Sequence, residues 1–292
     1  MGGTIAPRPV VSQGVRLRRL FRILYLLSGA AALLYEVVWL RLLTLSMGHT
    51  SRAVGILLAA FMGGLAVGAW TAGRSASSMT PARALRAYAV LEASIGTCAL
   101  ILPALLAAVH PVLQWVYGGE NAGSFEVMIA LLALLLLSVP TVAMGATYPV
   151  AVRWIEGADR SNRSERSMAL DVGGLYAVNT VGAALGAGLT GFALLPLLGI
   201  RGTTIVGVLL NAAAAGGALL LAKRQPAHER ARGDVEPTTP ERSRSIARGL
   251  RPARGGTQPE AVPVASRRVG LRIAATALGI SGCVALVYQV TW

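Results

Sequence analysis

Cysteine and histidine, the residues that most often build disulfide frameworks and metal sites, are scarce in this sequence. Two cysteines, Cys98 and Cys283, and three histidines occur in 292 residues. Each cysteine lies in a separate apolar run, where a thiol behaves as a small hydrophobic group. The histidines are scattered, and no Ser/His/Asp, zinc-ligand or phosphate-loop spacing occurs. The sequence therefore predicts no disulfide, no metal site, no cofactor and no catalytic residue in this chain.

Charged residues are also few. They make up 14% of the chain against 54% hydrophobic residues, and the mean hydropathy is +0.60. This is more apolar surface than one water-soluble core can bury, so the composition indicates an integral membrane protein whose main partner is the lipid bilayer. The net charge of +14 does not predict nucleic-acid binding, because the basic residues lie between apolar runs and do not gather with aromatic residues on one face.

Runs of about 20 predominantly apolar residues are long enough to cross the hydrocarbon layer as helices. Six complete runs of this kind occur, and a seventh begins near Leu271. The six runs are residues 21–45, 54–72, 87–109, 125–152, 170–198 and 203–222. We therefore expect an all-α membrane protein with a six-helix transmembrane bundle over residues 21–222.

The positions of the basic residues predict the orientation of this bundle. With a cytoplasmic N-terminus, only three of the 27 Lys and Arg residues would lie outside, namely Arg41, Arg52 and Arg201. The positive-inside rule favours this asymmetry. We expect a multi-pass protein of the plasma membrane with its N-terminus in the cytoplasm.

The segments outside the apolar runs are polar and basic. Residues 1–20 are expected to form a basic cytoplasmic tail, disordered over its first 17 residues, and residues 223–268 a disordered basic cytoplasmic linker. The basic residues of the linker either hold it to anionic lipid headgroups or only fix the topology and keep the segment solvated.

The stretch from Ser28 to Trp39 is repeated at the end of the chain. Residues 281–292 carry the same Ser, Gly, Ala, Leu, Tyr, Val and Trp in the same register. Two tandem helical bundles related by an axis along the membrane normal would leave such a repeat. We therefore expect residues 269–292 to be the first helix of a second, truncated bundle.

Glu36 is an acidic residue within the first apolar run. It lies 14 residues after Arg22, which places it roughly 21 Å along a helix at 1.5 Å per residue. A carboxylate at such a depth costs about 2.5–3.5 kcal/mol, so it needs a partner, a proton or an aqueous cavity. Glu36 is therefore predicted either to bind a cation or carry a proton, or to form an internal ion pair or hydrogen bond with Arg41 or a neighbouring helix.

Two aromatic and two amide side chains accompany this acid in the apolar runs. Tyr35 and Trp39 lie four residues apart on one helix face, where they either pack against a neighbouring helix or form a wall that faces a ligand. Asn179 and Asn211 would be costly against lipid, so we expect interhelical hydrogen bonds, with substrate contact as the alternative.

Two further acids lie near the predicted cytoplasmic ends of the runs. Glu92 is six residues past Arg86, and it is interpreted either as the partner of a loop arginine or as a gating contact. Asp171 is expected at the start of the fifth helix, where a carboxylate complements the positive end of the helix dipole.

The fifth run contains a glycine motif whose sequence context excludes nucleotide binding. The segment 186–191, GAGLTG, matches the dinucleotide fingerprint, but it continues a long apolar run and follows no strand. Instead, Gly182 with Gly186, and Gly64 with Gly68, are predicted to let helix backbones approach closely.

Four segments together carry a family resemblance. They are SGAAALLYEVVWLRLL (residues 28–43), LAAFMGGLAVGAWTAGR (58–74), PTVAMGATYPV (140–150) and GLYAVNTVGAALGAGLTGFALLPLLGIR (174–201). They resemble the membrane portion of the fused major facilitator superfamily/spermidine synthase family, which comprises spermidine synthase-like integral membrane proteins. The resemblance implies two helical bundles and a soluble aminopropyltransferase-like domain. The present chain would then hold one major-facilitator-like half and the start of the second, with the second bundle and the soluble domain missing.

Three functions are compatible with this sequence. The first is a transporter-like module for a small cation such as a polyamine, in which the hypothetical substrate-binding residues are Glu36, Tyr35, Trp39, Glu92 and Asn179, while Arg41, Asp171 and Asn211 have structural polar or ion-pair roles. The second, which the resemblance alone implies, is a membrane anchor for an aminopropyltransferase whose catalytic domain lies outside this chain. The third is a purely structural anchor, which requires Glu36 to be fully paired and to touch no cavity.

Overall fold

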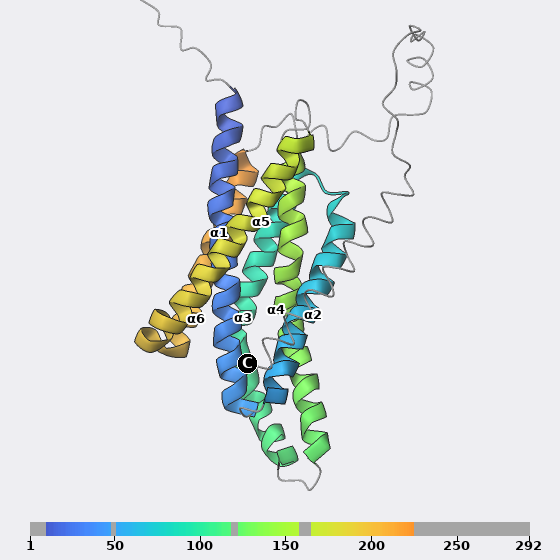
Figure 1. Cartoon of the computed structure of the whole chain (residues 1–292), viewed down its shortest axis with the longest axis vertical. Coiled ribbons are helices and arrows are strands. Elements are labelled where there is room, and N and C mark those ends of the chain that lie inside the picture. The colour runs from blue at the N-terminus through green and yellow to red at the C-terminus, as the bar shows by residue number, and fades with distance from the viewer. Residues whose placement is uncertain (1–9, 48–50, 118–121, 158–164, 225–292) are drawn as a thin grey trace, which may run out of the picture. The chain divides into compact units, whose positions relative to one another are not determined.

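The computed structural model of the chain describes residues 10–47, 51–117, 122–157 and 165–224, and nearly all of them are helical (Figure 1). The α-helices are α1 (Val10–Met47), α2 (Ser51–Ala76), α3 (Pro81–Tyr117), α4 (Ala122–Gly157), α5 (Glu165–Leu189) and α6 (Leu195–Arg224), and the π-helical segment η1 (Thr190–Leu194) joins the last two. These described residues contain no strand. The predicted all-α class is confirmed for this part of the chain.

Five helical stretches are long and apolar enough to cross a membrane. They are Gly14–Leu45, Val54–Ala76, Pro81–Val109, Leu131–Gly157 and Ser167–Arg224. The last is 58 residues long, more than twice the length that one crossing needs, and it contains both α5 and α6. Several helices of this kind indicate a multi-pass membrane protein.

Two predicted boundaries are wrong. The tail was expected to be disordered through residue 17, but α1 already begins at Val10, since no proline follows Pro9 in this region and Leu17 packs on the core. The linker was expected to begin at residue 223, but α6 continues through Arg224. The rest of the predicted linker and the predicted helix 269–292 lie outside the described residues.

Helix α5 runs parallel to α1 in close contact. Gly182 lies against the backbone of Leu26 and Gly186 against the backbone of Ala30, so the position along α1 advances by four residues as the position along α5 advances by four. A β-carbon at either glycine would overlap a carbonyl oxygen of α1. The predicted close approach at these two glycines is confirmed.

Helix α6 runs antiparallel to α1. Gly207 lies against the Tyr35 ring and Gly217 against Leu24, so the position along α1 decreases as α6 advances. The chain therefore reverses direction between Gly186 and Gly207, as Figure 1 shows at the lower left, where α5 is followed by α6. Gly199 has φ 64° and ψ −175°, a non-helical conformation that favours glycine, at the start of α6.

Helices α2 and α4 are packed through small residues in the same way. Gly64 lies against Thr141, Gly68 against the backbone of Val142, and Gly145 against the backbone of Leu65. Side chains larger than hydrogen would hold the two backbones apart at these points. This confirms the close approach predicted for Gly64 and Gly68.

The interior consists of two apolar clusters with a polar layer between them. The first contains Tyr35, Trp39, Phe61 and Leu102 among its members, and the second contains Phe21, Tyr25, Tyr88 and Trp154. Along α1, α3 and α6 the two clusters are separated at the positions of Ser28, Glu92 and Asn211. All three of these polar residues are buried.

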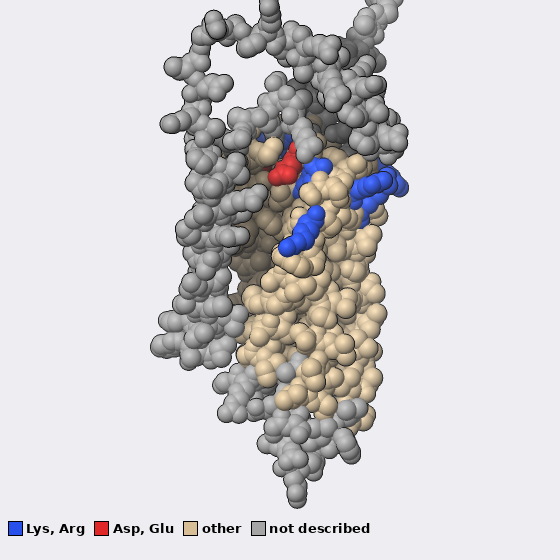
Figure 2. All heavy atoms as spheres, turned by 90° about the vertical axis from the view of Figure 1, so that its right-hand side faces the viewer, with Lys and Arg blue, Asp and Glu red and all other residues tan. Residues whose placement is uncertain are grey.

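The outward faces of the helices are strongly apolar. Large side chains such as Phe192 (91% exposed), Leu197 (79%) and Leu135 (71%) have no protein covering. In Figure 2 the charged side chains on the visible face, both basic and acidic, gather toward one end, and the remaining described surface of that face is uncharged. A surface of this kind suits a lipid environment, with polar groups confined to the edge.

Candidate functional site

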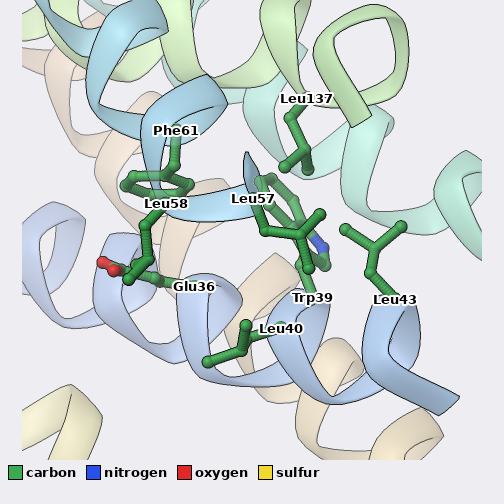
Figure 3. Close-up of a pocket in the computed structure, with 8 residues that line it drawn as sticks. All are labelled: Glu36, Trp39, Leu40, Leu43, Leu57, Leu58, Phe61 and Leu137. Carbon is green, nitrogen blue, oxygen red and sulfur yellow. The ribbon is translucent and has the colours of Figure 1, made fainter. Parts of the chain in front are cut away.

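Glu36 lies where α1, α2 and α4 meet. It lines a small pocket together with Trp39, Leu40 and Leu43 of α1, Leu57, Leu58 and Phe61 of α2, and Leu137 of α4 (Figure 3). The pocket encloses about 10 Å³ of free space, roughly what one water molecule needs. Apart from Glu36 and the indole nitrogen of Trp39, this lining is hydrocarbon.

The Glu36 carboxyl has no hydrogen bond or ion pair to any described residue. Its side chain is half-buried and extends past Leu58, away from Leu43 and Leu137, as Figure 3 shows. The ion pair considered with Arg41 is not formed, because five residues place the two side chains on different helix faces and Arg41 is exposed. Glu36 is thus an acid in an apolar setting, and no described residue neutralises its charge or donates a hydrogen bond to it.

Tyr35 and Trp39 stack on each other inside the bundle. Their ring centroids are 5.2 Å apart with 11° between the planes, and the two side chains are 0% and 1% exposed. Trp39 also lines the Glu36 pocket, whereas Tyr35 faces Gly207 of α6. The hydroxyl of Tyr35 and the indole nitrogen of Trp39 are buried without a hydrogen-bond partner among the described residues.

Glu92 forms a second polar site at the junction of α1, α3 and α6. The Ser28 hydroxyl donates to Oε1 of Glu92 at 2.5 Å, and the Asn211 amide donates to Oε2 at 2.6 Å. Glu92 is 0% exposed. It therefore does not pair with a loop arginine, because its carboxylate points into the bundle and not toward the helix end.

Three phenols surround this second site. Tyr25, Tyr35 and Tyr88 all lie near Glu92. Tyr88 packs edge to face on Phe21 at 5.3 Å, which fixes its ring above the site. The polar layer is therefore enclosed by aromatic side chains.

Asp171 links α5 to the amino-terminal part of α1. Its Oδ1 accepts from Arg22 at 2.6 Å and its Oδ2 from Arg18 at 3.3 Å. Asp171 is six residues inside α5, which begins at Glu165, so the expected position at the helix start is wrong. Its main described partners are two arginines and not the helix dipole.

Asn179, the remaining candidate, is half-buried on α5. Its backbone and side-chain oxygens lie against Gly29 of α1. It therefore belongs to the α1–α5 contact and faces neither Glu36 nor Glu92.

The predicted substrate-binding residues consequently do not form one site. Ser28, which donates to Glu92, and Glu36 are eight residues apart, about 12 Å along α1 and about 80° around it. The two acids therefore lie on different sides of α1. Glu36 faces α2 and α4, while Glu92 faces α1 and α6.

Sequence reasoning missed three of the polar partners. Ser28 lies in an apolar run with no periodic signal that marks it as a donor to Glu92. Arg18 and Arg22 carried a usable signal, since they are four residues apart and therefore share one helix face, but nothing in the local sequence identifies their partner on α5. The described residues contain no group of three or more His, Cys, Asp and Glu side chains that could hold a metal ion.

Comparisons with known proteins leave the chain without an assigned relative. No family model, no curated protein and no solved structure matches it.

Proposed function

We propose that this chain is a transporter-like membrane module that binds a small organic cation, of the polyamine class, at Glu36. The observation that carries this proposal is the Glu36 carboxyl itself, which lies in an apolar stretch, lines a pocket and lacks a partner among the described residues. Acids inside membrane helices are costly and commonly mark a pathway for cations or protons. A purely structural anchor would require a fully paired Glu36 that touches no pocket, which this geometry does not support.

The proposed bundle crosses the membrane six times, in the manner of one half of a major-facilitator-like protein. The opposite directions of the chain before and after Gly199 support two separate crossings within the 58-residue stretch. The N-terminus and the end of α6 would both lie in the cytoplasm of a cell whose plasma membrane holds the protein. This orientation is favoured by the basic residues at the two cytoplasmic ends, which are Lys223 and Arg224 of α6 and the arginines in the amino-terminal part of α1.

Substrate entry requires the pocket to widen, because about 10 Å³ is far smaller than any polyamine. The lining residues of α2 contribute only apolar contacts to α1 there, namely Leu57, Leu58 and Phe61. Separating such contacts breaks no hydrogen bond. We place the opening movement at this boundary of α1 with α2.

Uptake of labelled spermidine into vesicles reconstituted with the full chain tests the proposal. Glu36→Gln removes the charge with little change in volume, and the expected result is a loss of at least about tenfold, the value of one charge-assisted hydrogen bond of about 1.5–3 kcal/mol. Glu156→Gln is the matched control, since Glu156 lies in the last turn of α4 near its polar end. Equal uptake by the wild type and Glu36→Gln would refute the proposed binding role.

The six crossings are tested separately by labelling. A cysteine at Arg201, in a variant without Cys98 and Cys283, is expected to react with a membrane-impermeant thiol reagent on intact cells. A cysteine at Arg83, in the first turn of α3, is expected to react only after the cells are opened. The reverse pattern would refute the orientation, and a protected position 201 would refute the separate crossings.

A further inference from the structure

The layer formed by Ser28, Glu92 and Asn211 contains an acid whose two oxygens are both occupied. Oε1 accepts from the Ser28 hydroxyl of α1 at 2.5 Å, and Oε2 accepts from the Asn211 amide of α6 at 2.6 Å. Three helices that are distant in the sequence thus meet at one carboxyl group. The exposed fractions of Glu92 and Asn211 are 0% and 2%.

Glu92 is fully enclosed, and it has no positively charged partner among the described residues. None of the described Lys and Arg residues forms an ion pair with Glu92. A substrate cation has no access to a carboxyl that is fully enclosed and whose oxygens already accept two hydrogen bonds. A proton is the one cation that fits without displacing a side chain.

Both partners of Glu92 can serve its ionised and its protonated form. A serine hydroxyl donates or accepts as it rotates, and an amide presents nitrogen or oxygen after a half turn. The Oδ1 oxygen of Asn211 is buried and has no partner among the described residues. Turned toward Glu92, it would accept the hydrogen bond of a carboxylic acid.

The other titratable groups around Glu92 are phenols, which are uncharged near neutral pH. Tyr25 and Tyr35 face it from α1, and Tyr88 lies on α3 itself. From α6 the site receives the uncharged Asn211, and on α4 the uncharged Thr147 and the phenol Tyr148 lie near Tyr25. No neighbouring charge among the described residues therefore fixes Glu92 in one protonation state.

We propose that Ser28, Glu92 and Asn211 form a proton-binding site separate from the Glu36 pocket. Binding transfers one proton from water to a Glu92 oxygen and forms an O–H bond, with no other covalent bond of the protein made or broken. The Asn211 amide then turns, so that its N–H hydrogen bond to Oε2 is replaced by a hydrogen bond from the Glu92 O–H to Oδ1. The existence of this site is independent of Glu36. Its further role, as the site of a proton whose movement is coupled to cation transport, rests on the proposed function.

Infrared difference spectroscopy of the full chain in lipid, recorded in steps between about pH 4 and pH 10, tests the site without any substrate. Protonated carboxyl groups have a separate C=O stretching band. In a Glu36→Gln background, we expect a carboxyl band that grows as the pH falls and disappears when Glu92→Gln is added. Ser28→Ala retains the carboxyl but removes one hydrogen bond, so it is expected to shift the frequency of the same band.

The outcomes separate this inference from the proposed function. A Glu92 band that stays constant over the whole range, whether present or absent, would overturn the proton site even if spermidine is transported. A titrating Glu92 band supports the site even if Glu36→Gln leaves transport unchanged. If Glu92→Gln fails to fold, as judged by circular dichroism, the frequency shift in Ser28→Ala still decides between a titrating Glu92 and another acid.

Discussion

The contact of α1 with α5 yields a prediction that can be worked through from backbone geometry. Gly182 and Gly186 both lie against carbonyl oxygens of α1, at distances that a β-carbon cannot occupy. Gly186→Ala must therefore displace the backbone of Ala30, which is not a flexible side chain that can turn away. Overpacking of this kind typically costs about 1–3 kcal/mol.

The control is on the same helix. Gly188 has no atom within 4 Å of where a β-carbon would lie, so Gly188→Ala meets open space. Both substitutions gain the same helix propensity, about 1 kcal/mol for glycine to alanine. The difference between the two variants therefore isolates the clash, and we expect Gly186→Ala to be less stable than Gly188→Ala by about 1–3 kcal/mol.

The assay is unfolding of the full chain by sodium dodecyl sulfate in mixed micelles, followed by circular dichroism. Gly188→Ala is expected to unfold at the same or a higher detergent fraction than the wild type, and Gly186→Ala at a lower one. The pair Gly64→Ala and Gly63→Ala repeats the comparison on α2, since Gly64 lies against Thr141 and Gly63 meets nothing. Equal stabilities within either pair would refute the close backbone packing described here.

Two further predictions concern buried polar groups. Asp171→Asn weakens the contact with Arg18 and Arg22 at the edge of the bundle. In the same assay we expect the free energy of unfolding to fall by about 1–3 kcal/mol, between the value of an exposed ion pair and the lower value for a buried one. A loss no larger than that of an exposed surface substitution would contradict an ordering role for this pair. Tyr35→Phe removes a buried hydroxyl without a described partner and keeps the stacking on Trp39, so its stability is expected to equal or exceed that of the wild type. A clear destabilisation would show that the hydroxyl has a hydrogen-bond partner, and a stable variant with reduced spermidine uptake would place the hydroxyl on the substrate path.

Much of the fold was predictable from the sequence because the signals are local. A span is recognised from the length and hydrophobicity of one continuous segment. The first four predicted runs fall within α1 to α4, and the fifth and sixth both fall within the single apolar stretch Ser167–Arg224. The small-residue spacing at Gly64 and Gly68 was likewise sufficient to predict a close helix contact. The errors lie at helix ends such as Val10, because the ion pair that Arg18 forms with α5 is not visible in the local composition.

The candidate sites were predictable only in part. The sequence marks Glu36 and Glu92 as costly acids in apolar runs, but it treats them alike. The structure distinguishes them, since one lines a pocket without a described partner and the other is enclosed with two donors. Tyr35 and Trp39, which the sequence pairs on one face, divide between these two environments while remaining stacked.

The amino-acid sequence by itself determined that this protein belongs in a membrane, where its apolar segments lie, and which charged residues inside them need an explanation. These properties follow from the free energy of transferring consecutive side chains into hydrocarbon, which requires no knowledge of the neighbours. Only the tertiary structure decided that Glu92 meets Asn211, 119 residues away, while Glu36 does not. That choice depends on how the helices turn toward one another, which is set by backbone contacts at glycines such as Gly182 and Gly186 and not by the hydrophobicity of any single segment.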